Sequence, residues 1–227
     1  MVEYIYLVGS LITFAIWTLL YFIRRDLRKE MLVMGSIFGV LGIIMEAFIY
    51  TKDWWKPATI TGTLIGVEDF LFGFGVGGIA AIVYEDLFKR IISRKKTDHP
   101  HTKQLIIIVI VSIIIFNLMF YILRYNSFLS GLTATLVGTM VIWTIRKDLI
   151  IDSIVAGTTL TLFSFVGFAI LNILDSRFVY EWWFLDKLSG IIILGVPLED
   201  IIWFFTTGLF IGPIYELWQG GRFRKLK

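Results

Sequence analysis

Two pairs of neighbouring acidic residues lie inside apolar stretches of this sequence. One pair is Glu68-Asp69, which follows Gly66-Val67, and the other is Glu199-Asp200, which follows Pro197-Leu198, 131 positions later. A carboxylate inside a lipid bilayer is costly unless it is paired or used, and such residues mark functional sites. The same costly arrangement occurs twice in matching surroundings. We therefore predict that these four residues form a functional site.

The chemistry that such pairs can supply is proton transfer. A carboxyl group in an apolar cavity favours its protonated form, and a second carboxyl group beside it strengthens that preference. A protonated group can act as a general acid, and an ionised neighbour can act as a base. Neighbouring positions on a helix point about 100° apart, so only one member of each pair need face the cavity. We predict that the catalytic residues are Glu68, Asp69, Glu199 and Asp200, with the second pair as the acting acid.

Aromatic side chains follow both acidic pairs. Aromatic faces attract cations, most strongly where water is excluded. An acid, a base and aromatic faces in an apolar pocket suit the protonation of an alkene, passage through a carbocation and loss of a proton. That sequence of steps is isoprenoid cyclisation. We expect the substrate to contact Phe70, Phe72, Trp203 and Phe204.

Two further polar residues are expected to contact the substrate. Glu46 is near the outer end of the apolar run that precedes the first acidic pair, and Asn172 occupies the corresponding region of the second half.

The composition is that of a polytopic membrane protein. Of the 227 residues, 57% are hydrophobic and 17% are charged, with a mean hydropathy of +0.82. Soluble domains carry about 25% charged residues. Apolar runs of about twenty residues, the length of a membrane span, recur along the chain. The chain has no cysteine, and its two histidines lie in a basic loop, so we expect no metal site and no cofactor.

Seven transmembrane helices are predicted, and the fold class is all-α. They are placed at 2–23, 31–50, 60–84, 104–123, 127–145, 150–174 and 188–218. With the N-terminus outside, the inner segments 24–29, 89–103, 146–147 and 222–227 hold sixteen of the 21 Lys and Arg residues. Cytoplasmic loops carry the excess of basic residues. We therefore expect an integral protein of the cytoplasmic membrane, with its N-terminus outside and its C-terminus inside.

The sequence also contains an internal repeat. Arg24-Arg25-Asp26-Leu27 matches Arg146-Lys147-Asp148-Leu149, and Asp53-Trp54-Trp55 matches Glu181-Trp182-Trp183. The acidic pairs match at the same offset as Tyr84-Glu85 and Tyr215-Glu216.

This repeat predicts the architecture. Residues 1–90 form a first three-helix repeat, 91–126 form a basic loop and a connecting fourth helix, and 127–227 form a second repeat with a tail. The connecting helix makes the repeats parallel, related by a pseudo-two-fold axis along the membrane normal. Both acidic pairs then lie at one depth, roughly 12 Å along their helices at about 1.5 Å per residue. Glu85 and Glu216 are expected to form ion pairs near the basic loops.

At this point the chain resembles the membrane lycopene cyclases of bacteria, archaea and fungi, the flavin-independent heterodimeric or fused type. That family carries a Pro-x-Glu-Glu/Asp motif in the third helix of each repeat, followed by aromatic residues. Pro197-Leu198-Glu199-Asp200 matches the motif fully, and Gly66-Val67-Glu68-Asp69 departs from it at Gly66.

The resemblance implies a non-redox enzyme that converts the linear ψ-ends of lycopene to rings, most often β-rings. It also implies that the four acidic residues are the acid and base, and that the partners are a carotenoid substrate and membrane lipid. We expect no nucleic acid partner, and a homo-oligomer is left open.

Other functions remain open at this stage. A proton-coupled carrier would also use intramembrane carboxylates. A non-enzymatic carotenoid- or isoprenoid-binding protein would also have seven helices. A retinal-binding photoreceptor is disfavoured because residues 190–219 contain no lysine for a Schiff base.

Overall fold

The computed structural model describes residues 2–93 and 100–225. Seven helices in this part of the chain are long and apolar enough to cross a membrane. The helices are α1 (Val2–Ile23), α2 (Arg28–Phe48), α3 (Val67–Leu87), α4 (Thr102–Asn117), α5 (Ser127–Ile145), α6 (Ile150–Leu174), α7 (Phe178–Trp182), α8 (Leu198–Ile211) and α9 (Ile214–Gln219). The shorter elements are η1 (Tyr50–Lys52), η2 (Leu118–Ile122), η3 (Lys147–Leu149), β1 (Arg90–Ser93), β2 (Ile192–Ile193), β3 (Val196–Pro197) and β4 (Arg222–Lys225).

The predicted all-α, seven-helix fold is confirmed. The predicted bounds of α1, α5 and α6 agree with the structure, and those of α2 and α4 differ by a few residues. The last span is interrupted between α8 and α9, where Pro213 cannot donate the next helical hydrogen bond.

The predicted starts of the third and seventh spans are wrong. The helix α3 begins at Val67 rather than at residue 60, and α8 begins at Leu198 rather than at residue 188. The preceding residues form loops that include the hairpin of β2 and β3. Both acidic pairs therefore lie in the first turn of their helices, and the predicted distance of about 12 Å along the helix does not apply.

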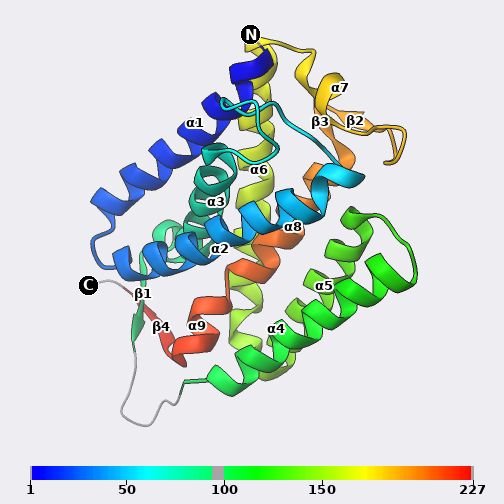
Figure 1. The fold of residues 1–227 in the computed structure, drawn as a ribbon. Helices are drawn as coiled ribbons and strands as arrows, with labels where there is room; N and C mark the ends of the chain where they lie inside the picture. The colour runs from blue at the N-terminus through cyan, green and yellow to red at the C-terminus, as the bar shows by residue number, and fades with distance from the viewer. Residues whose placement is uncertain (1, 94–99, 226–227) are drawn as a thin grey trace.

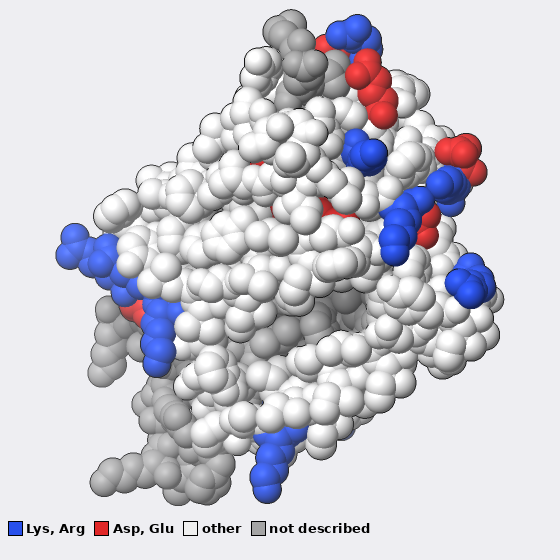
Figure 2. All heavy atoms as spheres, viewed as in Figure 1, with Lys and Arg blue, Asp and Glu red and all other residues white. Residues whose placement is uncertain are grey.

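The two central helices, α3 and α8, carry the core. In Figure 1, α1 lies on one side of this pair and α4 and α5 lie on the other, while α6 runs through the middle of the molecule. The helix α3 packs against α1 and α2, and α8 packs against α5 and α6. The most completely buried apolar residues of α3 are three consecutive ones, Ala80, Ala81 and Ile82. The peripheral helices instead expose large apolar side chains, as expected for a surface that faces lipid rather than water. Figure 2 shows charged side chains gathered toward the ends of the molecule, with a broad uncharged surface between them.

The two repeats pack internally in the same way. In the first, Gly35 of α2 is so close to α3 that an added Cβ would lie 2.9 Å from the carbonyl oxygen of Phe74. In the second, a Cβ on Gly157 of α6 would lie 2.7 Å from the carbonyl oxygen of Phe205. These residues correspond at the offsets that the sequence repeat predicts. The helices α1, α2 and α3 therefore correspond to α5, α6 and the α8–α9 pair, with α4 as the connector.

A pseudo-two-fold axis relates the repeats, and it can be located at both ends of the molecule. At one end, which we call the tryptophan end (Trp54, Trp55, Trp182 and Trp183), Trp55 forms an antiparallel bridge with its own counterpart Trp183. The flanking hydrogen bonds are reciprocal, with Lys56 N–H donating to the Trp182 carbonyl oxygen (2.8 Å) and Phe184 N–H to the Trp54 carbonyl oxygen (2.9 Å). At the opposite end, β1 pairs with β4, and Ile92 faces Phe223. Each pairing joins equivalent positions, so the axis passes through both.

An arginine anchors the same end of each repeat, which we call the arginine end (Arg24 and Arg146). The Arg24 guanidinium donates to Asp26 (2.8 Å) and to the carbonyl oxygens of Glu85 (2.9 Å) and Arg90 (3.0 Å). These hydrogen bonds lower the pKa of the partly exposed Asp26 carboxyl.

Its counterpart, Arg146, donates to Asp148 (2.7 Å) and to the Gly221 carbonyl oxygen (2.9 Å). The matching Arg-x-Asp motifs of the sequence therefore have the same structural role in both repeats. Each ties the loop after the first helix of its repeat to the end of the third.

Candidate active site

The members of each acidic pair point in different directions. Asp69 and Asp200 line a cavity between the repeats, whereas Glu68 and Glu199 are not among its lining residues. Glu68 Oε1 accepts the backbone N–H of Ile60 (2.6 Å), and Glu199 Oε1 accepts that of Ser189 (2.6 Å). The glutamates thus hold the loops that lead into α3 and α8, and the aspartates face the cavity.

Asp69 is held by two hydrogen-bond donors. Its Oδ1 accepts the hydroxyl of Tyr6 (2.7 Å), and its Oδ2 accepts the backbone N–H of Gly66 (2.7 Å) at the start of the same helix. The first turn of a helix also favours negative charge, because its backbone N–H groups carry partial positive charge. Asp69 is therefore fixed in orientation through both of its oxygens.

Asp200 has a different set of donors. Its Oδ2 accepts the indole N–H of Trp183 at 2.6 Å. The residue in the position of Gly66 is Pro197, which has no backbone N–H to give. Asp200 therefore lacks the helix-capping hydrogen bond that Asp69 receives, although both line the same cavity.

The structure explains why glycine replaces proline in the first motif. A Cβ on Gly66 would collide with Oε2 of Glu68 and would lie 2.9 Å from Cβ of Thr59. The φ angle of Gly66 is −125°, whereas that of Pro197 is −58°. Proline is restricted to about −65°. The loop before α3 therefore excludes proline, while the loop before α8 fits it.

The cavity between the repeats has a volume of about 390 Å³ and is predominantly apolar. Three carboxyl groups face it: Asp69, Asp200 and Glu46. Glu46 is buried near the end of α2, and its Oε2 has no hydrogen-bond partner among the described residues. The equivalent position in α6 is Phe168, which also lines the cavity. The repeats therefore build one asymmetric site rather than two identical ones.

Aromatic rings form much of the cavity wall. Tyr6 and Trp55 meet edge to face with ring centroids 5.1 Å apart, and Trp54 meets Trp203 in the same way at 6.1 Å. Phe72 and Phe204, which come from different repeats, lie 6.3 Å apart. The wall is thus rich in aromatic rings, whose faces attract cations.

Two of the residues predicted to contact the substrate lie elsewhere. Phe70 packs against Gly39 of α2 and Phe74 of α3. The Asn172 amide donates to the Gly195 carbonyl oxygen (3.2 Å) and so supports the turn of the β2–β3 hairpin. Neither is among the cavity-lining residues, whereas Glu46, Phe72, Trp203 and Phe204 are.

The cavity opens sideways between α2 and the α4–α5 pair. On one side of the molecule the repeats meet, because α1 packs against α6. On the opposite side the corresponding helices, α5 and α2, make little or no contact. Cavity-lining residues there include Leu41 of α2 and Ile113 of α4. Figure 2 shows the surface hollowed in this region.

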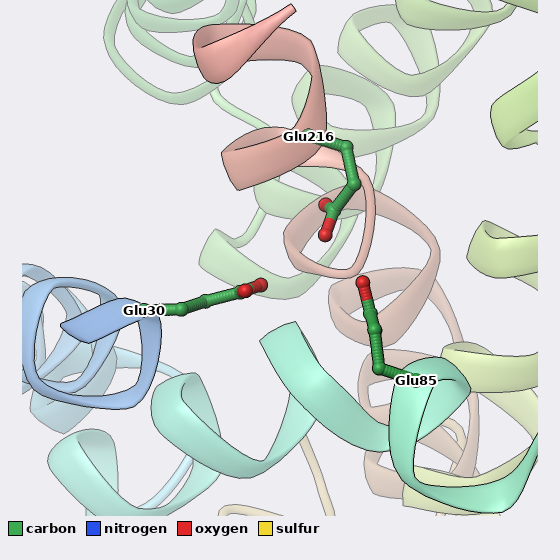
Figure 3. Close-up of side chains that lie close together, drawn as sticks. All are labelled: Glu30, Glu85 and Glu216. Atoms are coloured by element: carbon green, nitrogen blue, oxygen red, sulfur yellow. The ribbon is translucent and has the colours of Figure 1, made fainter. Parts of the chain in front are cut away.

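A second acidic cluster lies at the arginine end. Glu30, Glu85 and Glu216 come from α2, α3 and α9, and their carboxylates point toward one another (Figure 3). The prediction of ion pairs for Glu85 and Glu216 is wrong, since neither carboxylate has a partner among the described residues. Glu30 and its counterpart Asp152 went unnoticed in the sequence. The signal was available, because they match at the offset of Arg24 and Arg146.

The comparisons with known proteins agree with this architecture. The lycopene cyclase family model matches residues 3–87 and again residues 126–218. The two matched segments are the two repeats, and α4 lies between them. No curated protein and no solved structure matches the chain. The matched segments make up most of the sequence, so this integral membrane protein belongs to the lycopene cyclase family, whose members act on carotenoids.

Proposed function

We propose that this protein converts the ψ-ends of lycopene to β-rings by acid–base catalysis in the cavity between its repeats. The observation that carries the proposal is that one aspartate from each repeat faces a single apolar cavity walled by aromatic rings. A cavity of about 390 Å³ suits one end of the substrate, with the rest of the polyene extending through the opening between α2 and α4 into lipid.

In the first step, Asp200 gives its proton to the terminal alkene. We assign this role to Asp200 because Pro197 gives it no capping N–H. The resulting cation lies against the aromatic wall that includes Trp203 and Phe204. The next double bond of the chain attacks the cation, and this forms the ring carbon–carbon bond and moves the charge into the ring.

In the last step, a base removes a proton from the carbon beside the new cation and restores a double bond. We assign this role to Asp69, because the two donors that hold it support a carboxylate. Glu46 lies on the same cavity and can re-protonate Asp200 between turnovers with a proton taken from water. One proton is added and one is lost, so the product is an isomer of the substrate and no redox cofactor is required.

The orientation is also proposed. The arginine end holds most of the basic residues, and we place it at the cytoplasmic face by the positive-inside rule.

The experiment is expression in a bacterial host, followed by incubation of its isolated membranes with unlabelled lycopene in deuterium oxide buffer. We expect cyclic carotenoid, resolved by HPLC, with one solvent deuterium added per ring and detected by mass spectrometry. A well-expressed, membrane-inserted chain that leaves lycopene unchanged beside an active control cyclase would contradict the proposal. Cyclic product without solvent deuterium would contradict the protonation step alone.

A further inference from the structure

Four carboxyl groups are buried together at the arginine end, away from the proposed active site. They belong to Glu30 of α2, Glu85 of α3, Asp152 of α6 and Glu216 of α9, and their exposed fractions are 2%, 0%, 1% and 1%. Glu30 corresponds to Asp152, and Glu85 corresponds to Glu216, so each repeat contributes the same two positions. The cyclisation chemistry proposed above uses none of them.

Three of the four groups converge on one point. Glu30, Glu85 and Glu216 each offer an oxygen atom, and these atoms all lie within 4.8 Å of one another. Figure 3 shows the three side chains extending toward a common centre from three different helices.

Asp152 lies near this group but is not one of the residues whose oxygen atoms lie within 4.8 Å of one another. Its Oδ1 lies 3.5 Å from the position that a Cβ on Gly212 would take, one helical turn before Glu216. It is also close enough to Glu85 to interact with it electrostatically.

The carboxylate oxygens of the cluster lack hydrogen-bond donors. Within the described residues, both oxygens of Glu85, Asp152 and Glu216 have no partner, and Glu30 Oε1 has none. Arg24 donates to Asp26, Asp86 and backbone carbonyl oxygens. Arg146 donates to Asp148 and to the carbonyl oxygens of Glu216 and Gly221. These hydrogen bonds go to groups other than the carboxylates of the cluster.

Buried carboxylates at such separations require a counter-charge or protons, because an unpaired ion in an apolar interior is very costly. Hard divalent cations bind carboxylate oxygens at about 2.0–2.6 Å. Oxygens on opposite sides of one ion are therefore separated by about 4–5 Å, and the three oxygens here all lie within 4.8 Å of one another. Shared protons are the alternative to a bound ion, and the test below distinguishes the two.

We propose that Glu30, Glu85 and Glu216 bind one hard divalent cation of the Mg²⁺ and Mn²⁺ class, with the carboxylate of Asp152 nearby. The ion joins α2 and α3 of the first repeat to α9 of the second. The ion would connect the two repeats at the arginine end, and the Trp55–Trp183 bridge connects them at the tryptophan end. The sequence led us to expect no metal site, and this inference replaces that expectation.

The test uses the full-length protein purified in detergent, treated with EDTA and titrated with Mn²⁺. Electron paramagnetic resonance measures free Mn²⁺, and thermal melting measures stability. We expect about one Mn²⁺ bound per chain, a higher melting temperature with Mn²⁺ or Mg²⁺, and binding at least tenfold weaker in Glu85→Gln/Glu216→Gln. The matched control is Glu181→Gln, which removes an exposed carboxylate and should bind Mn²⁺ as the wild type does.

The wild-type titration decides the question even if the double variant fails to fold. The proposal is overturned if the wild-type chain neither binds Mn²⁺ nor gains stability from Mn²⁺ or Mg²⁺. It is also overturned if the double variant binds as tightly as the wild type. Infrared bands of protonated carboxyl groups that are present in the wild type with Mn²⁺ and absent from Glu85→Gln/Glu216→Gln would show that the cluster holds protons instead.

Discussion

The two residues of each acidic pair have different roles, because in both pairs the glutamate side chain accepts a hydrogen bond from the backbone of the preceding loop. Glu68 and Glu199 accept backbone N–H groups of the preceding loops, and this use turns them away from the cavity. The aspartates that follow face the cavity instead. Since neighbouring helical positions diverge by about 100°, only one of the two can do so. The two chemically similar residues of a pair should therefore respond differently to the same kind of substitution.

Substitution of Asp200 should abolish most of the activity. Asp200→Asn keeps the shape of the side chain but removes its acidic proton, and general acids contribute about 10²–10⁴-fold to rate. We expect at least a 100-fold loss of cyclic product. Glu199→Gln keeps an oxygen that can accept the Ser189 N–H, so its loss should stay below about tenfold.

HPLC of pigment, normalised to membrane-inserted protein, checks both variants, with the exposed Asp186→Asn as the neutral control. Equal losses in Asp200→Asn and Glu199→Gln would contradict the separate roles of the two residues.

The sequence identified both acidic pairs, and it could not show which member of each faces the cavity. That choice depends on the loops before α3 and α8, whose backbone N–H groups capture the glutamates. The effect of Gly66 in place of proline was likewise hidden, because it depends on the proximity of Thr59 and Glu68. Glu30 and Asp152 were missed for a different reason. A carboxylate in the first turn of a helix is an ordinary helix-start signal, and only the repeat offset distinguishes this pair.

At the scale of elements, close approach of helices without side chains between them sets the geometry of both repeats. Gly208 of α8 is in contact with α6, where an added Cβ would lie 2.6 Å from the Ala156 carbonyl oxygen and 2.6 Å from the Gly157 Cα. Small residues at such crossings let membrane helices approach closely. The opposing atoms belong to the backbone, so a larger residue cannot be accommodated by a change of rotamer.

Gly208→Ala should therefore destabilise the protein. Forcing an extra methyl group into a packed contact costs about 1–3 kcal/mol, and the melting temperature in detergent should fall by several degrees. Gly167→Ala in α6 is the matched control, since an added Cβ there meets nothing within 4 Å. It should stay within about 1 kcal/mol of the wild type. Identical melting temperatures for the two variants would show that α6 and α8 are not packed this closely.

The sequence predicted all seven membrane-spanning helices, but it placed the starts of the third and seventh incorrectly. Hydropathy located α1, α5 and α6, because polar residues bound these apolar runs on both sides. It extended α3 and α8 too far toward their N-termini, because the preceding loops contain apolar residues such as Ile60 and Ile192. Hydropathy cannot distinguish a loop supported by a glutamate from another helical turn. Gly66 and Pro197, which stand at the true helix starts, were the available signals.

At the scale of the whole molecule, the asymmetric contact between the repeats determines how a long substrate can enter. The helices α1 and α6 are in contact where the repeats meet on one side of the molecule. The equivalent helices α5 and α2 leave an opening on the other side. Leu41 and Ile113 lie at this opening, both line the cavity, and their exposed fractions are 41% and 55%. A rigid polyene cannot reach the aspartates through a narrowed opening.

Narrowing the opening should slow conversion of lycopene without changing the chemistry. The variant Leu41→Trp/Ile113→Trp should lower the initial rate in liposomes about tenfold or more, because entry then requires the helices to separate. The variant Leu19→Trp/Leu118→Trp adds the same bulk at exposed positions that do not line the cavity, and it should keep the wild-type rate. A comparable loss in both variants would place the entry route elsewhere.

The bridge between Trp55 and Trp183 has an evolutionary consequence. A residue that touches its own counterpart across a two-fold axis is the signature of contact between two identical chains. A single-repeat ancestor would therefore have assembled as a homodimer through this same bridge, with two equal carboxylate sites. Joining two such copies through a connecting helix like α4 would allow the two sites to become different. The two repeats do differ at the cavity, where Glu46 corresponds to Phe168, and at the helix starts, where Gly66 corresponds to Pro197.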